Sequence, residues 1–278
     1  MSRMNWVGAA LCVLVFAGSF LLSEGASRFF NLTGLAIVLS GTVGAALLSY
    51  PWKNLRAAWQ VAWNAYAVEP PSEDEVVSAL AKFSVHSRRD GMLSLERFEK
   101  KTSVSFLRHA LEMLVDGYEA REMREILSTE MSYFRQRRTN QERVFRHLAR
   151  LAPAFGVAGS VVGLMSLLLG VGDTAVVIRT IPLALTSTLY GIVLANFFLT
   201  PAAEAIHAKT QQELLVMRLA ADGALAVLAE QNPHKLEKKL ESFLTPSTRT
   251  GSQRSLEEMR ERFIAEREHE SEEKQVSV

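Results

Sequence analysis

Residues 151–172 (LAPAFGVAGSVVGLMSLLLGVG) and 180–201 (TIPLALTSTLYGIVLANFFLTP) are two apolar runs joined by a short connection. Glycines and hydroxyls interrupt both runs, and Tyr190 is their only ionisable side chain. About 20 helical residues cross a hydrocarbon layer of about 30 Å, so each run is long enough to span a bilayer. The two runs predict a membrane hairpin with a polar seam and no carboxylate of its own.

Two further segments, residues 4–23 and 32–50, also lack Asp, Glu, Lys, Arg and His. We therefore expect four membrane helices. The first run also fits a cleavable signal peptide, because Arg3 precedes it and small residues follow it. Its apolar stretch exceeds the roughly 7 to 15 residues of a signal-peptide core, which favours a membrane helix.

Lysines and arginines collect between residues 51 and 152, whereas the connections 24–31 and 173–179 carry only Arg28 and Arg179. Positively charged loops stay on the cytoplasmic side of a membrane. The large loop and the C-terminal tail are therefore expected in the cytoplasm, and both short connections outside.

The expected fold is an all-α membrane protein with a large helical cytoplasmic domain between membrane helices 2 and 3 and a helical C-terminal tail. The expected parts are residues 1–50 (membrane helices 1 and 2), 51–150 (cytoplasmic domain), 151–202 (membrane helices 3 and 4), 203–246 (helical tail) and 247–278 (charged, disordered tail). Cytoplasmic helices are predicted over residues 54–66, 72–88, 92–101, 103–117 and 120–150. The last should continue into the third membrane segment, because no Gly or Pro interrupts it before Pro153.

The predicted helix over residues 54–66 places aromatic side chains on one side, with Trp59, Trp63 and Tyr66 at helical spacing. Aromatic residues next to a membrane exit favour a helix lying among lipid headgroups. A helix packed on the protein's own cytoplasmic part fits equally well.

The third membrane segment carries Gly156, Gly159 and Gly163 on one flank, a spacing that lets helix backbones approach closely. The fourth crowds Thr186, Ser187, Thr188, Tyr190 and Gly191 into about one and a half turns. In lipid each hydroxyl needs a partner, either on its own helix or across an interface. Both alternatives remain open for Ser160 and Thr188.

Pro153 and Pro201 stand near the predicted cytoplasmic ends of helices 3 and 4. Proline removes one backbone hydrogen bond and loosens the helix locally. Each proline is a kink in a static structure and a candidate hinge in a moving one.

Taken in order, these motifs resemble the third and fourth helices of flagellar stator A subunits, the MotA/PomA type. The resemblance covers nearly the whole chain up to about residue 246. The segments that carry it are 152–156, 159–164, 185–191, 195–196 and Pro201, together with 49–51, Arg88, Gly91, Leu95, Glu96, 232–233 and 239–240.

The resemblance implies an ion-conducting subunit of the bacterial flagellar motor, which drives motility and is under the control of chemotaxis. It implies an inner-membrane homopentamer around two copies of a B subunit that is anchored to peptidoglycan. The B subunit's membrane helix would bring the aspartate that this chain lacks. Ion flow along Ser160, Ser187, Thr188 and Tyr190 would then produce torque on the rotor.

Other residues take roles from the same resemblance. Pro153 and Pro201 match the family's two functional prolines, and Arg88 and Glu96 match its charged pair that meets the rotor switch protein. We assign helix packing to Gly156, Gly159, Gly163 and Gly191. Arg179 and Pro182 depart from the family pattern near the ion entrance.

We expect no cofactor and no bound metal, and a transported proton. Sodium stays the alternative, because in this family hydroxyls at the places of Ser160 and Thr188 accompany sodium use. A small apolar residue there accompanies proton use.

Three other classes compete with the stator. The ExbB/TolQ energisers resemble it but have three membrane helices, and a non-conducting scaffold does not explain a hydroxyl-rich, charge-free hairpin. An enzyme is disfavoured because the sequence has no GxxxxGK[ST] or HExxH motif and its histidines are scattered. The net charge of +1, with acidic and basic residues interleaved, gives no sign of nucleic-acid binding.

Overall fold

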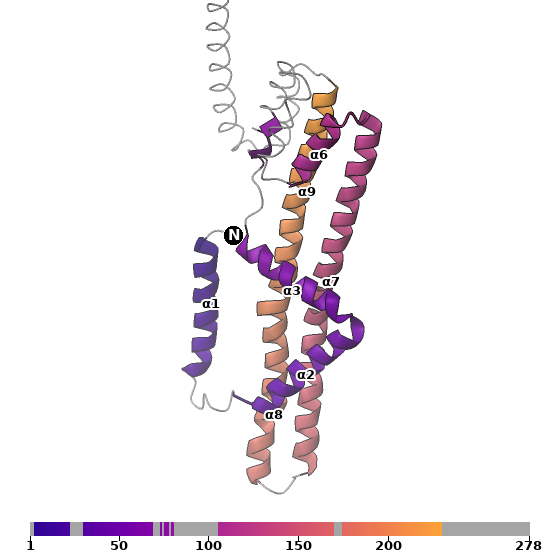
Figure 1. The fold of residues 1–278 in the computed structure, drawn as a ribbon. Helices are drawn as coiled ribbons and strands as arrows, with labels where there is room; N and C mark the ends of the chain where they lie inside the picture. The colour runs from indigo at the N-terminus through magenta and orange to yellow at the C-terminus, as the bar shows by residue number, and fades with distance from the viewer. Residues whose placement is uncertain are drawn as a thin grey trace, which may run out of the picture. The chain divides into compact units, whose positions relative to one another are not determined.

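The computed structural model describes residues 3–22, 30–68, 73, 75–77, 79–80, 105–169 and 174–229 (Figure 1). Its elements are, in chain order, α1 (Arg3–Leu21), α2 (Leu32–Ser49), α3 (Trp52–Ala67), α6 (Ser105–Val115), α7 (Ala120–Leu169), α8 (Thr174–Val193), the π-helix η3 (Leu194–Leu199) and α9 (Thr200–Leu228). The described part of the chain contains no strand, so the predicted all-α class is confirmed there.

Three helical stretches are long and apolar enough to cross a membrane by length and composition, namely those within Leu32–Ser49, Ala120–Leu169 and Thr180–Leu228. They include the expected helices 2, 3 and 4. Among the described residues of α1, the apolar stretch is Ala10–Ser19, which is shorter than the three candidate spans. The fourth span therefore stays a prediction.

Helix α7 runs without a break for 50 residues, with Pro153 inside it. This confirms the predicted continuity from the polar segment into the apolar one. Helix α8 begins at Thr174, and the candidate membrane span within it begins at Thr180, as expected for the apolar run 180–201.

The chain divides into two compact units: Met1–Glu69 with Gln136–Thr210, and Pro70–Arg135 with Gln211–Val278. Both α7 and α9 contribute residues to each unit. In the second unit, α6 buries its apolar face against the first turns of α7 and the last turns of α9. The largest of these buried side chains are Leu107, Leu111, Leu114, Met123, Leu127 and Leu219.

Helix α6 ends at a glycine for a conformational reason. Gly117 has a φ of +79°, a left-handed conformation that L side chains rarely adopt. Tyr118 N–H donates to Met113 O at 3.1 Å and Gly117 N–H to Leu114 O at 3.3 Å, the pattern of a Schellman cap. This cap turns the chain from α6 into α7.

In the first unit, α3 packs through its small residues. Ala58 and Ala62 are buried against Val144 and Phe145 of α7 and a cluster from α9, which is Ala202, Ala203 and Ile206. A neighbouring face of the helix exposes Trp52, Trp59 and Trp63, at 71%, 66% and 69% of their surfaces. The helix thus packs on its own chain through alanines. That its exposed tryptophans lie among lipid headgroups stays a prediction.

A lysine that the sequence analysis missed holds the end of α3. Lys209 is 9% exposed, and its ammonium donates to Asn64 O at 2.7 Å and to Val68 O at 2.8 Å. Carbonyls at a helix C-terminus lack intrahelical partners and carry partial negative charge. Lys209 of α9 therefore caps α3.

Helix α2 crosses the pair formed by α7 and α8 (Figure 1). Its buried residues are Gly34, Val38, Thr42 and Ala46, one per turn. The ring of Phe155 on α7 occupies the place where a side chain at Gly41 would stand. Near the end of α2, Tyr50 Oη lies 3.2 Å from His147 Nδ1.

Candidate functional site

The helices α7 and α8 touch through glycines. A Cβ atom added at Gly156 would lie 2.9 Å from Ser187 O, and one at Gly163 would lie 2.8 Å from Ala184 N. From the other side, a Cβ at Gly191 would lie 2.5 Å from Ala152 O. Distances below 3.0 Å to backbone atoms leave room for a hydrogen only, so the two backbones approach as closely as the small-residue spacing allows.

Gly159 faces a side chain and not a backbone. Its added Cβ would meet Ser187 Cβ at 2.8 Å and Ser187 Oγ at 2.9 Å, with Ile37 of α2 at 3.5 Å. Ser187 is completely buried. The hydroxymethyl group of Ser187 therefore fills the space that Gly159 leaves open.

The Oγ of Ser160 lies close to three other oxygen atoms. Its Oγ is 2.5 Å from Thr188 Oγ1, 2.5 Å from Ala184 O and 3.2 Å from Gly156 O. One of these partners is on its own helix and two are on α8. Ser160 therefore has hydrogen-bond partners both on its own helix and across the interface with α8. The side chains of Ser160 and Thr188 are half-buried.

The neighbouring Thr186 and the predicted path residue Tyr190 have different partners. Thr186 Oγ1 donates to Pro182 O at 2.6 Å, one turn back on α8. Tyr190 Oη accepts the N–H of Asn31 at 2.8 Å. The structure therefore joins Ser160 and Thr188 in one cluster, places Ser187 against Gly159, and ties Tyr190 to the start of α2.

The two prolines lie in different backbone environments. Pro153 sits within the regular α-helix α7, with its Cα 3.0 Å from the position of a Cβ at Gly191. Pro201 is the second residue of α9, after Thr200, whose N–H donates to Ala195 O of η3, five residues back. The wide turn thus comes just before the residue that has no N–H to donate.

The side chain of Asn196 supports this wide turn. Its Nδ2 donates to Ile192 O at 3.0 Å. The sequence analysis missed the π-helix, although an asparagine in an apolar run shortly before a proline was a signal for irregular hydrogen bonding. Functional sites often contain such single π-turns.

The oxygen cluster can accept hydrogen bonds or surround a small cation, but it carries no formal charge. The apolar runs 151–172 and 180–201 supply no Asp or Glu. Moving an ion through a low-dielectric region without a counter-charge is costly. The cluster therefore offers oxygen ligands but supplies no counter-charge of its own.

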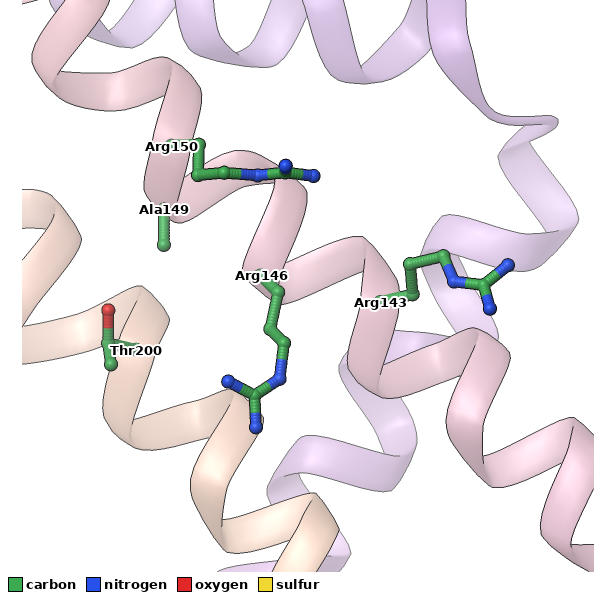
Figure 2. A pocket seen from close by; sticks show the side chains of 5 residues that line it. All are labelled: Arg143, Arg146, Ala149, Arg150 and Thr200. Carbon is green, nitrogen blue, oxygen red and sulfur yellow. The ribbon is translucent and has the colours of Figure 1, made fainter.

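A hollow of about 490 Å³ lies near the polar end of the apolar part of α7 (Figure 2). It is lined by Arg143, Arg146, Ala149, Arg150 and Thr200. Three arginines thus border the segment where α7 becomes apolar at residue 151.

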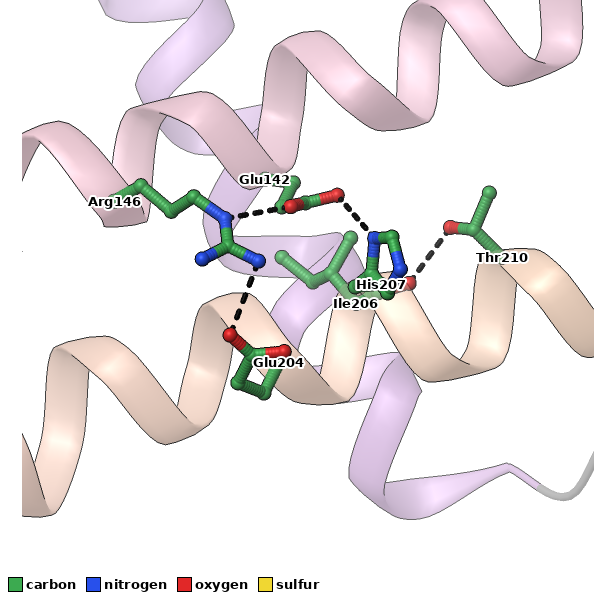
Figure 3. Close-up of polar contacts among 6 residues, drawn as sticks. All are labelled: Glu142, Arg146, Glu204, Ile206, His207 and Thr210. Carbon is green, nitrogen blue, oxygen red and sulfur yellow. Dashed lines mark hydrogen bonds and ion pairs between the residues drawn. The ribbon is translucent and has the colours of Figure 1, made fainter.

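A charged network links α7 to α9 beside this hollow (Figure 3). Arg146 Nε donates to Glu142 Oε1 at 2.7 Å, and Arg146 Nη2 lies 3.0 Å from Glu204 Oε1. The second oxygen of Glu142 is 3.1 Å from His207 Nδ1. The hydrogen bond with Glu142 is the main reason why the pKa of Arg146 is raised above its usual value.

Several predicted residues lie outside the described part of the chain. Among them are Arg88 and Glu96, the expected rotor contact, and residues 230–278 of the tail. The backbone of Arg179 belongs to α8, near the start of that helix.

Comparisons with known proteins agree along most of the chain. Residues 99–219 match the model of the MotA/TolQ/ExbB proton channel family. The chain is 28% identical to chemotaxis protein PomA of Vibrio alginolyticus over 83% of this chain and 90% of that one. It is 29% identical to "Uncharacterized protein YtxD" of Bacillus subtilis, over 85% and 88% of the two chains.

A solved structure shares the fold. The flagellar MotAB stator complex from Bacillus subtilis contains a chain that superposes with a TM-score of 0.81 at 26% identity. The match covers 90% of this chain and 98% of that one.

Proposed function

We propose that the chain, whose residues 99–219 match the model of the MotA/TolQ/ExbB proton channel family, is the ion-conducting A subunit of a bacterial flagellar stator. It couples ion flow to torque on the rotor. The observation that carries this function is the Ser160–Thr188 oxygen cluster within a hairpin that has no carboxylate. The likeness to PomA and to a MotAB stator chain supports the same assignment.

The proposed assembly supplies the missing charge. We propose that five copies of this chain surround two copies of a B subunit, whose membrane helix places an aspartate beside α7 and α8. The solved relative is a complex of A and B subunits, which supports such a partner. The peptidoglycan anchor of the B subunit would hold the complex still while the A ring moves.

The proposed mechanism alternates the charge of that aspartate. When the carboxylate loads an ion it becomes neutral and fits the oxygen cluster around Ser160; when it releases the ion it becomes charged again. A membrane potential of about 100 mV makes one charge worth about 2.3 kcal/mol, enough to shift the balance between two packed states. The glycine contacts allow α7 and α8 to slide, and Pro153 and the η3–Pro201 turn let them bend.

Ion uptake tests the function. Vesicles that hold this chain with an aspartate-bearing B subunit should take up protons, whereas vesicles that hold this chain alone should take up none. Replacing the B-subunit aspartate by asparagine is the matched control and should abolish uptake. Conduction by the chain alone would contradict a borrowed carboxylate.

The transported ion is proposed to be a proton. Ser160 and Thr188 also offer oxygen ligands to sodium, so the ion needs its own measurement. Swimming speed at fixed pH should be the same with and without sodium. A speed that falls when sodium is removed would assign sodium.

We further propose four membrane helices, α1, α2, the apolar part of α7 and α8 with η3, in the bacterial inner membrane. The segment 51–150 and the C-terminal tail would face the cytoplasm. The excess of Lys and Arg in these segments supports this orientation.

A further inference from the structure

Tyr190 lies on the side of α8 that is turned away from the Ser160–Thr188 cluster. It follows Thr188 by two residues, which is a rotation of about 200° around a helix with 3.6 residues per turn. Thr188 meets Ser160 of α7, whereas the Oη of Tyr190 accepts the backbone N–H of Asn31 at 2.8 Å. Helix α8 thus presents one hydroxyl to the cluster and another to the start of α2.

Asn31 is the residue at which α2 is fixed. It is the N-cap of that helix, and its Oδ1 accepts the N–H of Gly34 at 3.1 Å. The first N–H groups of a helix have no partner within the helix. The Asn31 side chain satisfies one of them, and the hydroxyl of Tyr190 satisfies the N–H of Asn31 itself. Tyr190 therefore sets the place where α2 begins.

Helix α2 packs directly behind the oxygen cluster. A Cβ atom added at Gly159 would lie 2.9 Å from Ser187 Oγ and 3.5 Å from Ile37 Cγ2 of α2. Gly159 and Ser187 are the sequence neighbours of Ser160 and Thr188, the two residues that form the cluster. Ile37 therefore closes the space behind the pair of helices at the level of the cluster.

A second contact attaches α2 to the other helix of the hairpin. The ring of Phe155 on α7 occupies the place where a side chain at Gly41 would stand. Gly41 follows Asn31 by ten residues, about 15 Å along the helix axis. Helix α2 is thus attached to α8 at its start and to α7 near its middle. All these contacts lie inside one compact unit of the chain and join buried or half-buried residues.

We propose that Tyr190 is a positioning residue, which holds α2 against the hairpin and takes no part in the ion path. Without its hydroxyl, the first turn of α2 loosens, and Ile37 packs less firmly behind the oxygen cluster. The cluster keeps all its oxygen atoms but loses its fixed geometry. The inference rests on the proposed function, because it states what Tyr190 does for ion flow.

The contact itself is tested without ion flow. Tyr190→Phe removes the hydroxyl and keeps the ring. Hydrogen–deuterium exchange of the full-length complex in nanodiscs should show the Asn31 amide exchanging roughly fivefold faster, as expected for one neutral hydrogen bond of about 1 kcal/mol. The control Tyr133→Phe, which removes a hydroxyl from an exposed side chain of α7, should leave this exchange unchanged.

Ion uptake by vesicles that hold this chain and the B subunit separates positioning from a place in the path. Tyr190→Phe should lower the maximal uptake rate by at most about fivefold, which is the same free energy expressed as a barrier. The ion concentration for half-maximal uptake and the preference between proton and sodium should stay unchanged, because the oxygen ligands stay.

A second variant displaces α2 without touching Tyr190. Gly41→Ala pushes a methyl group into the ring of Phe155 and should lower the maximal uptake rate in the same way. The matched control is Gly44→Ala, where an added Cβ meets nothing within 4 Å. It should conduct like the wild type.

Three results would overturn the proposal. Unchanged exchange in Tyr190→Phe would show that its hydroxyl does not hold α2. Faster exchange with unchanged uptake would make Tyr190 a structural contact only, and a shifted half-maximal concentration or ion preference would place it in the path. If the wild-type complex takes up neither protons nor sodium, the proposed function fails, and the exchange measurement alone decides whether Tyr190 holds α2.

Discussion

At the residue scale, the hairpin depends on glycines whose missing side chains let two backbones touch. The change Gly163→Ala would push a methyl group to 2.8 Å from the backbone nitrogen of Ala184, which has no flexible end to move away. We expect overpacking of this kind to cost about 1 to 3 kcal/mol. Thermal unfolding of the detergent-solubilised assembly measures the loss.

The control for this change is Gly44→Ala in α2, where an added Cβ meets nothing within 4 Å. It should leave the melting temperature unchanged or raise it slightly, because alanine favours helix over glycine. Equal melting temperatures for both variants would mean that α7 and α8 are not closely packed in the membrane.

Lys209 is the second residue with a sharp expected effect. Lys209→Met keeps the length of the side chain but leaves the carbonyls of Asn64 and Val68 without its ammonium. A hydrogen bond from a charged donor contributes about 1.5 to 3 kcal/mol, so the end of α3 should fray, although Asn64 O still accepts the N–H of Val68 at 3.1 Å. Limited proteolysis in membranes should then cut faster near Val68, whereas the exposed Lys53→Met should change nothing.

At the element scale, the wide turn η3 is the feature most suited to bending. Its hydrogen bonds span five residues instead of four, so removing one residue should restore an ordinary α-helix without turning the flanking helices out of register. Deleting Phe198, whose side chain is exposed, should preserve membrane insertion but reduce motility strongly. Swarming on soft agar and protein levels in the membrane measure the two effects.

Phe198→Leu keeps the chain length and is the matched control. It should swarm nearly as well as the wild type. Full motility of the deletion variant would show that the wide turn η3 is not needed to convert ion flow into torque.

At the scale of the whole molecule, the proposed function gives the chain two partners, a B subunit in the membrane and the rotor outside it. Arg88 and Glu96 are the proposed rotor contact, on the strength of the family resemblance. Arg88→Glu or Glu96→Arg should cut swarming several-fold, because a like charge replaces an attraction at the interface. Membrane insertion should be unaffected, and unchanged swarming would remove both residues from the rotor surface.

Much of the helical architecture could be predicted because its signals are local. The continuity of α7 followed from the absence of Gly and Pro before Pro153. Hydropathy placed the apolar run from Thr180, and the structure adds that α8 itself begins earlier, at Thr174. The expected stator family is supported by the comparisons, because its motifs keep their order along the chain.

The amino-acid sequence by itself determined which segments are apolar, which positions are glycine or hydroxyl, and that the hairpin has no carboxylate. These properties are set by composition and spacing within single helices. The tertiary structure decided which groups meet: Ser160 with Thr188, Gly159 with Ser187, Lys209 with the end of α3, and Glu142 with His207. These contacts join residues distant in sequence or depend on how two helices are rotated against each other, and helical periodicity alone does not specify that rotation.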